Sequence, residues 1–287
     1  MSPDLNMKIE RNTVHQMEAL ALMQGLDDAS VDAYILDLPY GTTACHWDTI
    51  IPFEPMWREV KRTLKPRGVF VTTTTEPFTS LLVVSNLEMF RYKWAWNKGQ
   101  GSDFQLAKLR PLSVIEDVCV FSQGRTANGA ALNMAYYPQM KRRDKPVTSG
   151  GAPNAKYLNP HNMTALHNTY DESYPVSLIE FNKDVGIDRI HPTQKPVALY
   201  EYLIRTYTQP GELVVDFCCG SGTTAVAARN TKRDFIVGDT DAHYCNVARE
   251  RLRQPYERHY VKRDEDVTTM DVKDGYKNHL FAVSESD

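Results

Sequence analysis

Short apolar runs alternate with helical patterns in the first third of the chain. Val31–Leu36 is rich in strand-forming residues and ends at Asp37-Leu38-Pro39-Tyr40, where the proline stops the strand. Apolar residues in Met56–Leu64 recur every four positions, which predicts a helix, and Val69–Thr74 reads as a buried strand. Residues 65–68 (KPRG) predict a turn between them. The order is β, α, β.

The same alternation returns towards the other end of the chain. Val197–Tyr207 and Thr223–Asn230 have helical spacing. Leu213–Phe217 and Phe235–Gly238 are apolar runs on either side of the second helix, so they predict a complete βαβ unit. A further helix is predicted at Tyr244–Arg253.

Between these two regions the hydrophobic periodicity fades. Residues 124–190 are crowded with Gly, Pro, Asn, Ser and basic side chains. We therefore predict that this stretch is a loop-rich insert outside the core. Residues 255–287 are polar and form a fourth segment that we expect to be peripheral.

Composition narrows the class of protein. The chain has 287 residues, 42% of them hydrophobic, so it can bury a sizeable core and is not a disordered tail. No apolar run approaches the roughly 18 residues of a membrane helix. Met1–Arg11 has no apolar segment of the kind found in secretory signals, so we expect a cytoplasmic protein with no membrane partner. The five cysteines include no CxxC pair, which argues against a disulfide framework or a zinc site.

The net charge of −3 conceals an uneven distribution. Eleven basic and four acidic residues lie between Arg91 and Lys156, so this middle part carries +7 and the rest −10. A polyanion such as DNA would bind there, because each neutralised phosphate releases counterions. A solvated surface run is the alternative interpretation.

Residues 215–224 (VDFCCGSGTT) follow a strand and begin a helix. Gly220 and Gly222 let the backbone approach a ligand at the carboxyl end of the strand, which favours a nucleotide-like cofactor. Ala225 replaces the third glycine of the dinucleotide fingerprint, which counts against NAD. Asp239 follows at the distance where a carboxylate can accept from ribose hydroxyls, although a tight turn with a capping acid remains the alternative.

Three segments together resemble a known family. Asp37–Tyr40 resembles the D-P-P-Y element of amino-group DNA methyltransferases, 191–196 (HPTQKP) resembles the element before their cofactor half, and Asp216–Gly222 resembles their F-x-G-x-G loop. Their order is that of the β class, and the resemblance covers about Val31 to Leu252. Leu38 departs from the commoner Pro, and Asp239 from a more usual Glu.

The resemblance implies an α/β fold. It is a doubly wound, mostly parallel, seven-stranded sheet of the Rossmann-like methyltransferase type, with helices on both faces and an inserted target-recognition region. The implied segments are a catalytic half at 1–123, the insert at 124–190, a cofactor half at 191–254 and the C-terminal extension at 255–287.

The resemblance also assigns the chemistry. An exocyclic amine of adenine or cytosine is a poor nucleophile because its lone pair is conjugated into the ring. Asp37 and the Leu38 carbonyl would each accept a hydrogen bond from one of its two N–H groups and so localise the lone pair on nitrogen. Pro39 would fix the loop, and Tyr40 would stack on a base flipped from the duplex.

The implied cofactor is S-adenosylmethionine (SAM), and no metal is expected. His191 could act as a general base, but its place in the family element favours shaping the cofactor pocket. For Lys195 a direct contact and a role in starting the next helix stay open. The residues assigned to cofactor binding are Asp37, Thr193, Lys195, Asp216, Phe217, Cys218, Gly220, Ser221, Gly222, Thr223 and Asp239.

Double-stranded DNA is the expected partner, with a homodimer and a cognate restriction endonuclease as further partners and the nucleoid as location. Residues of the types that read base edges occur at Asn133, Gln139, Asn154 and Asn162. The residues expected to hold phosphates are Arg110, Lys141, Arg142, Arg143 and Lys145.

Several functions remain in competition. Adenine N6 methylation comes first, because adenine enzymes of the family usually begin the motif with Asp and cytosine N4 enzymes with Ser. Cytosine C5 methylation is disfavoured because the chain has no Pro-Cys pair. RNA or protein methylation, a DNA-binding module with SAM as a structural ligand, and a dinucleotide oxidoreductase also stay open.

Overall fold

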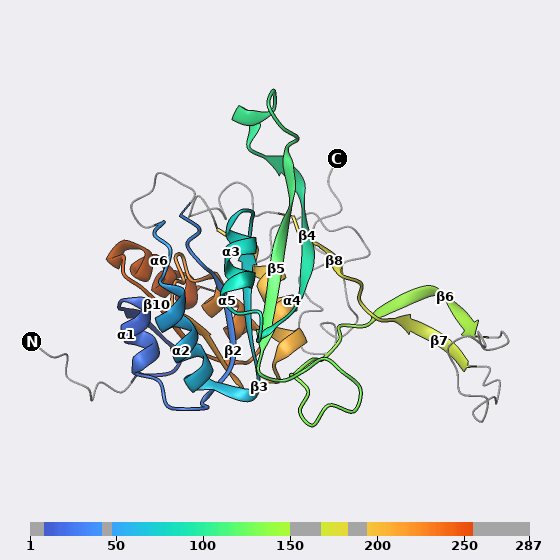
Figure 1. Cartoon of the computed structure of the whole chain (residues 1–287), viewed down its shortest axis with the longest axis horizontal. Helices are drawn as coiled ribbons and strands as arrows, with labels where there is room; N and C mark the ends of the chain where they lie inside the picture. The colour runs from blue at the N-terminus through green and yellow to red at the C-terminus, as the bar shows by residue number, and fades with distance from the viewer. Residues whose placement is uncertain (1–8, 42–47, 150–167, 183–193, 255–287) are drawn as a thin grey trace, which may run out of the picture. The chain divides into compact units, whose positions relative to one another are not determined.

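The computed structural model describes residues 9–41, 48–149, 168–182 and 194–254. They contain an eight-stranded sheet and a separate two-stranded sheet (Figure 1). These described residues divide into two compact units, one within 9–137 and 177–254 and the other within 138–176. The predicted C-terminal extension, 255–287, lies outside the described residues.

The large sheet has the strand order β1-β10-β9-β2-β3-β5-β4-β8. From β1 to β3 the neighbours are parallel, β5 is antiparallel to both β3 and β4, and β8 is parallel to β4. The strands are β1 (Thr13–Gln16), β2 (Val31–Asp37), β3 (Leu64–Thr74), β4 (Phe90–Ser102), β5 (Ser113–Ser122), β8 (Leu178–Glu180), β9 (Leu213–Asp216) and β10 (Asp234–Asp239).

Two details differ from the sequence prediction. The sheet has eight strands and not seven, because the three residues of β8 pair with β4 although no strand-length apolar run marks them. The predicted turn at 65–68 falls inside β3. Leu64 lies opposite Val31 and Val69 lies opposite Ala33. Residues 65–68 of β3 therefore face only one residue of β2 and form an irregularity in the pairing of the two strands.

The predicted helices are confirmed, with α4 and α5 at the predicted bounds. Helix α6 begins at Ala242, two residues before the predicted start at Tyr244. Asp241 caps it, because its carboxylate accepts from the backbone N–H groups of His243 and Tyr244. The helices are α1 (Ala19–Gln24), α2 (Phe53–Thr63), α3 (Phe78–Ser85), α4 (Val197–Tyr207), α5 (Thr223–Asn230) and α6 (Ala242–Arg253), with the 3₁₀ turn η1 (Phe104–Leu106).

Alternate residues of the strands pack into two hydrophobic cores, one on each face of the sheet. On β2, Tyr34 and Leu36 pack with α1, α2 and α3, whereas Ala33 and Ile35 pack with α4, α5 and α6. Successive strand residues point to opposite faces, so helices cover both faces as predicted. None of the helices in the described part of the chain has the length and apolarity needed to cross a membrane.

The segment 124–190 was expected to lie outside the core, and two of its residues show otherwise. Met134 and Ile179 are buried in the core cluster on the side of α4, α5 and α6. The backbone around Met134 is fixed at Ala135, whose N–H donates to the Arg67 carbonyl. The insert therefore contributes apolar side chains to the sheet domain near both of its ends.

The second unit contains an antiparallel strand pair. These strands are β6 (Lys141–Ser149) and β7 (Asn168–Ser173), with a register shift between Arg142 and Val147. The side chains of β6 whose burial is described are exposed, which includes all four of its predicted phosphate-binding residues.

Candidate active site

The carboxyl ends of three neighbouring strands bring the predicted elements together. Asp37 ends β2, Asp216 ends β9 and Asp239 ends β10, and these strands lie side by side and parallel. The Cys218 Sγ lies 3.3 Å from the Asp37 carbonyl oxygen. The glycine turn and the Asp37 loop are therefore adjacent, as the sequence predicts from parallel topology.

The Asp37 carboxylate is held by one of its two oxygens. The Tyr40 and Thr73 hydroxyls each donate to Oδ1 at 2.5 Å, and the Lys195 Nζ lies 3.3 Å from the same oxygen. Among the described residues, no hydrogen bond to Oδ2 is found. The protein thus orients the carboxylate and leaves one oxygen available to a ligand.

A buried network of charges continues from Lys195. Its Nζ lies 3.0 Å from Glu116 Oε2, and the Lys98 Nζ lies 3.0 Å from Glu116 Oε1. The Lys98 side chain is only 2% exposed, and the side chains of Glu116 and Lys195 are each 10% exposed. Two lysines and the carboxylates of Asp37 and Glu116 carry no net charge together, which makes their joint burial tolerable.

The network sets the protonation of its members. Burial raises the pKa of Asp37 above its ordinary value, and Lys195, Thr73 and Tyr40 oppose that rise. Burial would also raise the pKa of Glu116, but Lys195 and Lys98 lower it to about 2. Burial would lower the pKa of Lys195, but Asp37 and Glu116 outweigh it and raise that pKa. Lys195 therefore stays charged and favours ionised Asp37.

The loop after Asp37 is fixed by a second carboxylate. Asp48 Oδ1 accepts from the backbone N–H of Tyr40 at 2.7 Å and of Gly41 at 2.8 Å. The Tyr40 ring packs against Phe78, with ring centroids 5.2 Å apart. Leu38 is buried, and within the described residues nothing donates to its carbonyl oxygen.

The two glycines of the turn have different surroundings. Both have positive φ, +48° at Gly220 and +81° at Gly222, which disfavours any side chain. A Cβ on Gly222 would lie 2.6 Å from the Ala248 Cβ on α6, whereas a Cβ on Gly220 would meet none of the described atoms within 4 Å. Gly222 therefore allows helix packing, and Gly220 borders open space.

Hydrogen bonds tie the glycine turn to its surroundings. The Gly220 N–H donates to Asp239 Oδ2 at 2.9 Å. Arg251 on α6 donates to the Ser221 carbonyl at 2.7 Å, and the Thr223 hydroxyl donates to the Lys195 carbonyl at 3.3 Å. These bonds connect the turn to the segment before α4 and to α6.

Two of the predicted cofactor residues are deeply buried. Asp216 is 2% exposed, and its carboxylate accepts from the Cys218 N–H at 3.0 Å and the Thr224 hydroxyl at 2.5 Å. Burial raises the pKa of Asp216 to about 7. The Phe217 side chain packs in the core against Tyr34. His191 and Thr193 lie outside the described residues.

The predicted DNA-binding residues fall in different units. Arg110 lies between β4 and β5 and pairs with Asp103 at 2.8 Å. The four on β6, Lys141, Arg142, Arg143 and Lys145, belong to the second unit. Asn154 and Asn162 lie outside the described residues.

Sequence reasoning missed Lys98, Glu116, Thr73 and Arg251. Lys98 and Glu116 were only counted among the charged residues between Arg91 and Lys156, yet a charged residue inside a largely apolar strand needs a partner once it is buried. A charged residue within each of these strands was therefore the signal that could have identified both. Thr73 and Arg251 carried no such signal, because threonine is ordinary in strands and arginine near the end of a helix.

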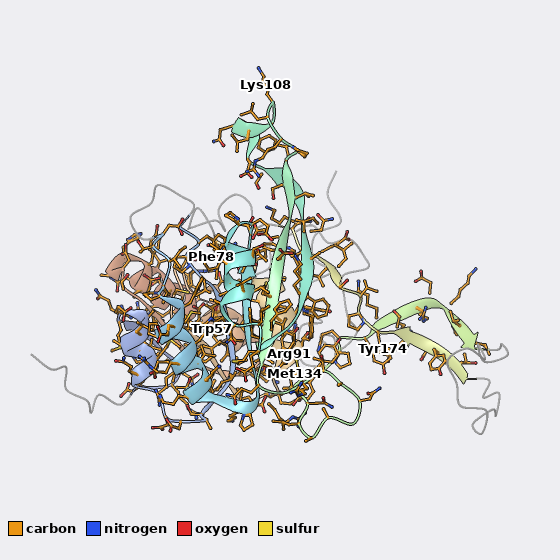
Figure 2. The ribbon with its side chains drawn as sticks, viewed as in Figure 1. Trp57, Phe78, Arg91, Lys108, Met134 and Tyr174 are labelled. Atoms are coloured by element: carbon orange, nitrogen blue, oxygen red, sulfur yellow. The ribbon has the colours of Figure 1, made fainter. Side chains whose placement is uncertain are left out.

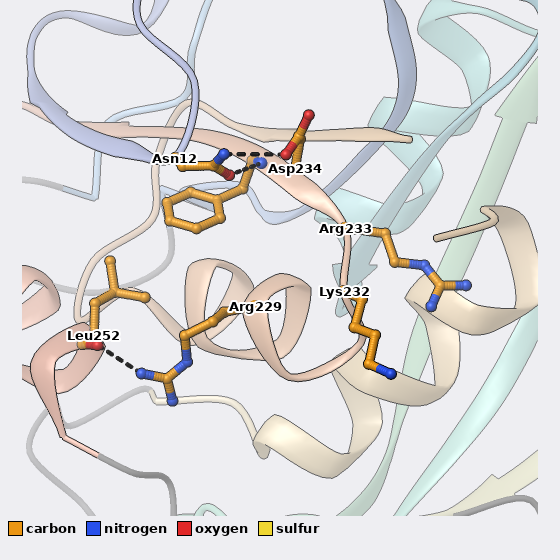
Figure 3. Close-up of a pocket in the computed structure, with 7 residues that line it drawn as sticks. Asn12, Arg229, Lys232, Arg233, Asp234 and Leu252 are labelled. Atoms are coloured by element: carbon orange, nitrogen blue, oxygen red, sulfur yellow. Dashed lines mark hydrogen bonds between the residues drawn. The ribbon is translucent and has the colours of Figure 1, made fainter. Parts of the chain in front are cut away.

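A cavity of about 480 Å³ lies at the amino ends of the parallel strands, by the start of β10 and away from the carboxyl ends that carry Asp37 and Asp239 (Figure 3). The Arg229 guanidinium in it donates to the Leu252 carbonyl, and the Arg233 guanidinium donates to the Thr208 carbonyl and hydroxyl. Asp234 accepts from Asn12. These side chains stabilise local structure away from Asp37.

Comparison with known proteins covers most of the chain. Residues 31–250 match the model of the family of N6 and N4 methyltransferases described as DNA methylase. The chain belongs to this DNA methylase family. Membership decides against a dinucleotide oxidoreductase.

Relatives and solved structures cover most of the DNA methylase chain. The type II methyltransferase M1.MboII of Moraxella bovis is 28% identical over 86% of this chain and 98% of its own. M.HpaI of Haemophilus parainfluenzae is 27% identical over 82% and 72%.

Among solved structures, the M1.HpyAVI–SAM complex has a TM-score of 0.53 at 21% identity, covering 84% of this chain and 99% of its own. The cytosine-N4-specific PvuII DNA methyltransferase has a TM-score of 0.60 at 17% identity, covering 85% and 87%. These two likenesses support the fold.

Proposed function

We propose that this DNA methylase transfers a methyl group from SAM to the N6 amine of an adenine flipped out of double-stranded DNA. The observation that carries the proposal is the asymmetric setting of Asp37. Three side chains hold Oδ1, and in the described chain no hydrogen bond goes to Oδ2. The Leu38 carbonyl next to it accepts no hydrogen bond from a described group.

These two oxygens suit an exocyclic amine. The amine has two N–H groups, and Asp37 Oδ2 and the Leu38 carbonyl each accept one of them. The lone pair is then localised on nitrogen, and the positive charge that develops there lies beside a carboxylate. Pro39 limits the conformations of the loop, and the Tyr40 ring provides the stacking surface for the flipped base.

Lys195 is a positioning residue in this scheme. Its ammonium group holds Oδ1 of Asp37, and Glu116 and Lys98 hold the ammonium group in turn. Ionised Asp37 accepts the amine N–H at Oδ2 and also stabilises positive charge on nitrogen, which a neutral carboxyl group does far less well. The proposal thus gives Lys195 a task at Asp37, beside the cofactor contact that the resemblance assigns to it.

The cofactor is SAM, which supplies an electrophilic methyl group when bound. The glycine turn fits such a group, since Gly220 borders open space at the carboxyl edge where a Cβ would project. Asp239 on the adjacent strand is the proposed acceptor for the ribose hydroxyls. In this structure its Oδ2 accepts from the Gly220 N–H and its Oδ1 from the Asp241 N–H, so the ribose would share these oxygens with the backbone. Thr193, Ser221 and Thr223 remain proposed contacts.

Adenine is favoured over cytosine by the chemistry of the first motif residue. Asp37 brings a full negative charge to the amine, which matches the aspartate usual in the adenine enzymes of the family. Cytosine N4 is the alternative. Both amines present two N–H groups, so the product has to be identified directly.

The DNA partner is supported by the exposed basic residues of β6, which we propose as phosphate contacts. Such a substrate places the enzyme at the nucleoid in the cytoplasm. The relatives named as type II methyltransferases support a cognate restriction endonuclease as a functional partner. A homodimer stays a prediction.

The test is to incubate the protein with duplex DNA and methyl-labelled SAM, digest the DNA to nucleosides and identify the labelled base by mass spectrometry. We expect label in N6-methyladenine. Label in N4-methylcytosine would keep the mechanism and correct the base. Denatured DNA and RNA of matched length serve as controls, and label in RNA with none in duplex DNA would contradict the proposal.

A further inference from the structure

The hairpin between β4 and β5 extends past the active-site edge of the sheet. Asp117 of β5 lies opposite Thr74, the last residue of β3, so the residues before Asp117 continue beyond the carboxyl end of β3. Figure 1 shows this hairpin projecting past the other strands, and Figure 2 places Lys108 at its far end. We call residues 99–115 the hairpin arm.

The arm exposes large apolar side chains instead of burying them. Leu109 is 82% exposed and Phe104 is 70% exposed, and both lie in its outer part. Four further apolar residues of the arm are at least one third exposed: Leu106, Leu112, Val114 and Ile115. Such a group of exposed apolar residues next to an active site marks an interaction surface.

The tip of the arm is held by its own hydrogen bonds. The backbone N–H groups of Leu109 and Arg110 donate to the Leu106 carbonyl at 2.8 and 3.0 Å. The Arg110 guanidinium pairs with Asp103 at 2.8 Å. The apolar side chains are thus presented on a preformed support, which lowers the entropic cost of using them in binding.

We propose that the arm inserts into a groove of duplex DNA and places Phe104 and Leu109 against the base step opened when the target base flips. A two-stranded ribbon is roughly 10 Å wide, since strands lie about 4.8 Å apart, and the major groove of about 12 Å admits it. Lys108 and Arg110 flank Leu109 and suit the phosphates.

A second copy of the chain fits the arm less well. The centre of a protein interface is depleted in charged residues, whereas Leu109 at the tip of the arm stands between Lys108 and Arg110. The arm also starts at the active site, because Lys98 of the network immediately precedes it and Glu116 immediately follows it. Apolar wedges at an opened base step stabilise the unstacked duplex, which is what a base-flipping enzyme requires.

This inference rests on the proposed function, and its test keeps the two apart. The variant is Phe104→Ala/Leu109→Ala, with Val84→Ala/Leu87→Ala on and after α3 as the control, because Val84 and Leu87 are 70% and 63% exposed. Single-turnover methylation is measured on the duplex site mapped for the wild type. The same duplex is then prepared without the base opposite the target.

We expect the arm variant to lose about tenfold or more on the paired duplex and less than threefold on the duplex lacking the opposing base, where flipping costs less. The control should match the wild type on both. Equal losses on the two duplexes, or no loss, would overturn the inference. A wild type inactive on every duplex would instead refute the proposed function.

Two measurements guard the interpretation. Thermal melting shows whether the arm variant keeps its fold, and Leu109→Ala alone replaces it if it does not. Sedimentation of the wild type and the variant tests whether the arm binds a second copy. A dimer that the variant converts to monomer would overturn the DNA assignment of the arm.

Discussion

The two ends of strand β2 each carry an aspartate, buried at Asp32 and half-buried at Asp37, and the contacts of the two carboxylates differ. At the amino end, the Lys65 Nζ lies 2.8 Å from both oxygens of Asp32, and the Leu213 N–H donates to Oδ2 at 2.9 Å. At the carboxyl end, the described contacts of Asp37 all go to Oδ1.

The difference separates a structural carboxylate from a functional one. Asp32 has both oxygens engaged and joins β2 to the start of β9 and to Lys65 on β3, so little remains for a ligand. Asp37 is oriented as firmly but keeps one acceptor. Burial of an aspartate therefore does not identify the site, whereas an oriented carboxylate with a free oxygen at the carboxyl edge does.

The largest expected effect on activity comes from replacing each of the two aspartates, one at a time, by asparagine. Asp37→Asn should lower single-turnover methylation by about 10²–10³-fold with a small change in Tm, because the charge facing the amine is lost. Asp32→Asn should keep most of the activity and lower stability by about 1 kcal/mol, since Lys65 is partly exposed and screened. Equal activity losses in the two variants would remove the distinction.

The cations beside the two aspartates give the second comparison. Lys195→Met removes the positive charge that opposes the raised pKa of Asp37, so that pKa should rise further. Activity requires ionised Asp37 and increases as pH rises through this pKa, so the acid limb of the pH–rate profile should move to higher pH. At a fixed pH well below the pKa of Asp37, the activity of Lys195→Met should be about tenfold lower than that of the wild type for each unit by which the substitution raises that pKa.

Lys65→Met is the matched control at the other end of β2. It should leave the acid limb in place and lower only the melting temperature. A Lys195→Met profile that falls equally at every pH would show that Lys195 does not act through the ionisation of Asp37.

The smallest effects should come from the two glycines of the turn. Gly220→Ala should cost about 1 kcal/mol of stability through its positive φ and weaken SAM binding, because the methyl group enters the open space. Gly222→Ala meets Ala248 and should lower the Tm more, with a smaller effect on SAM affinity. Calorimetric titration with SAM and thermal melting separate the two, and a larger affinity loss for Gly222→Ala would contradict the assignment.

Local sequence pattern establishes the elements and the edge at which the site forms. The four-residue spacing in Val197–Tyr207 predicts the bounds of α4, and the continuous apolar runs of β2 and β9 indicate buried parallel strands. Because parallel strands end at a common edge, the residue pattern is enough to place the motifs at Asp37 and Asp216 together.

Which atoms meet at that edge depends on the folded chain. The partnership of Lys98 and Lys195 with Glu116 joins residues far apart in the chain, so no local pattern shows it. The pairing of β8 with β4 likewise depends on an available neighbour and not on its own three residues. Local periodicity reports which face of an element is buried, whereas the partner of a buried charge is set by how distant elements pack.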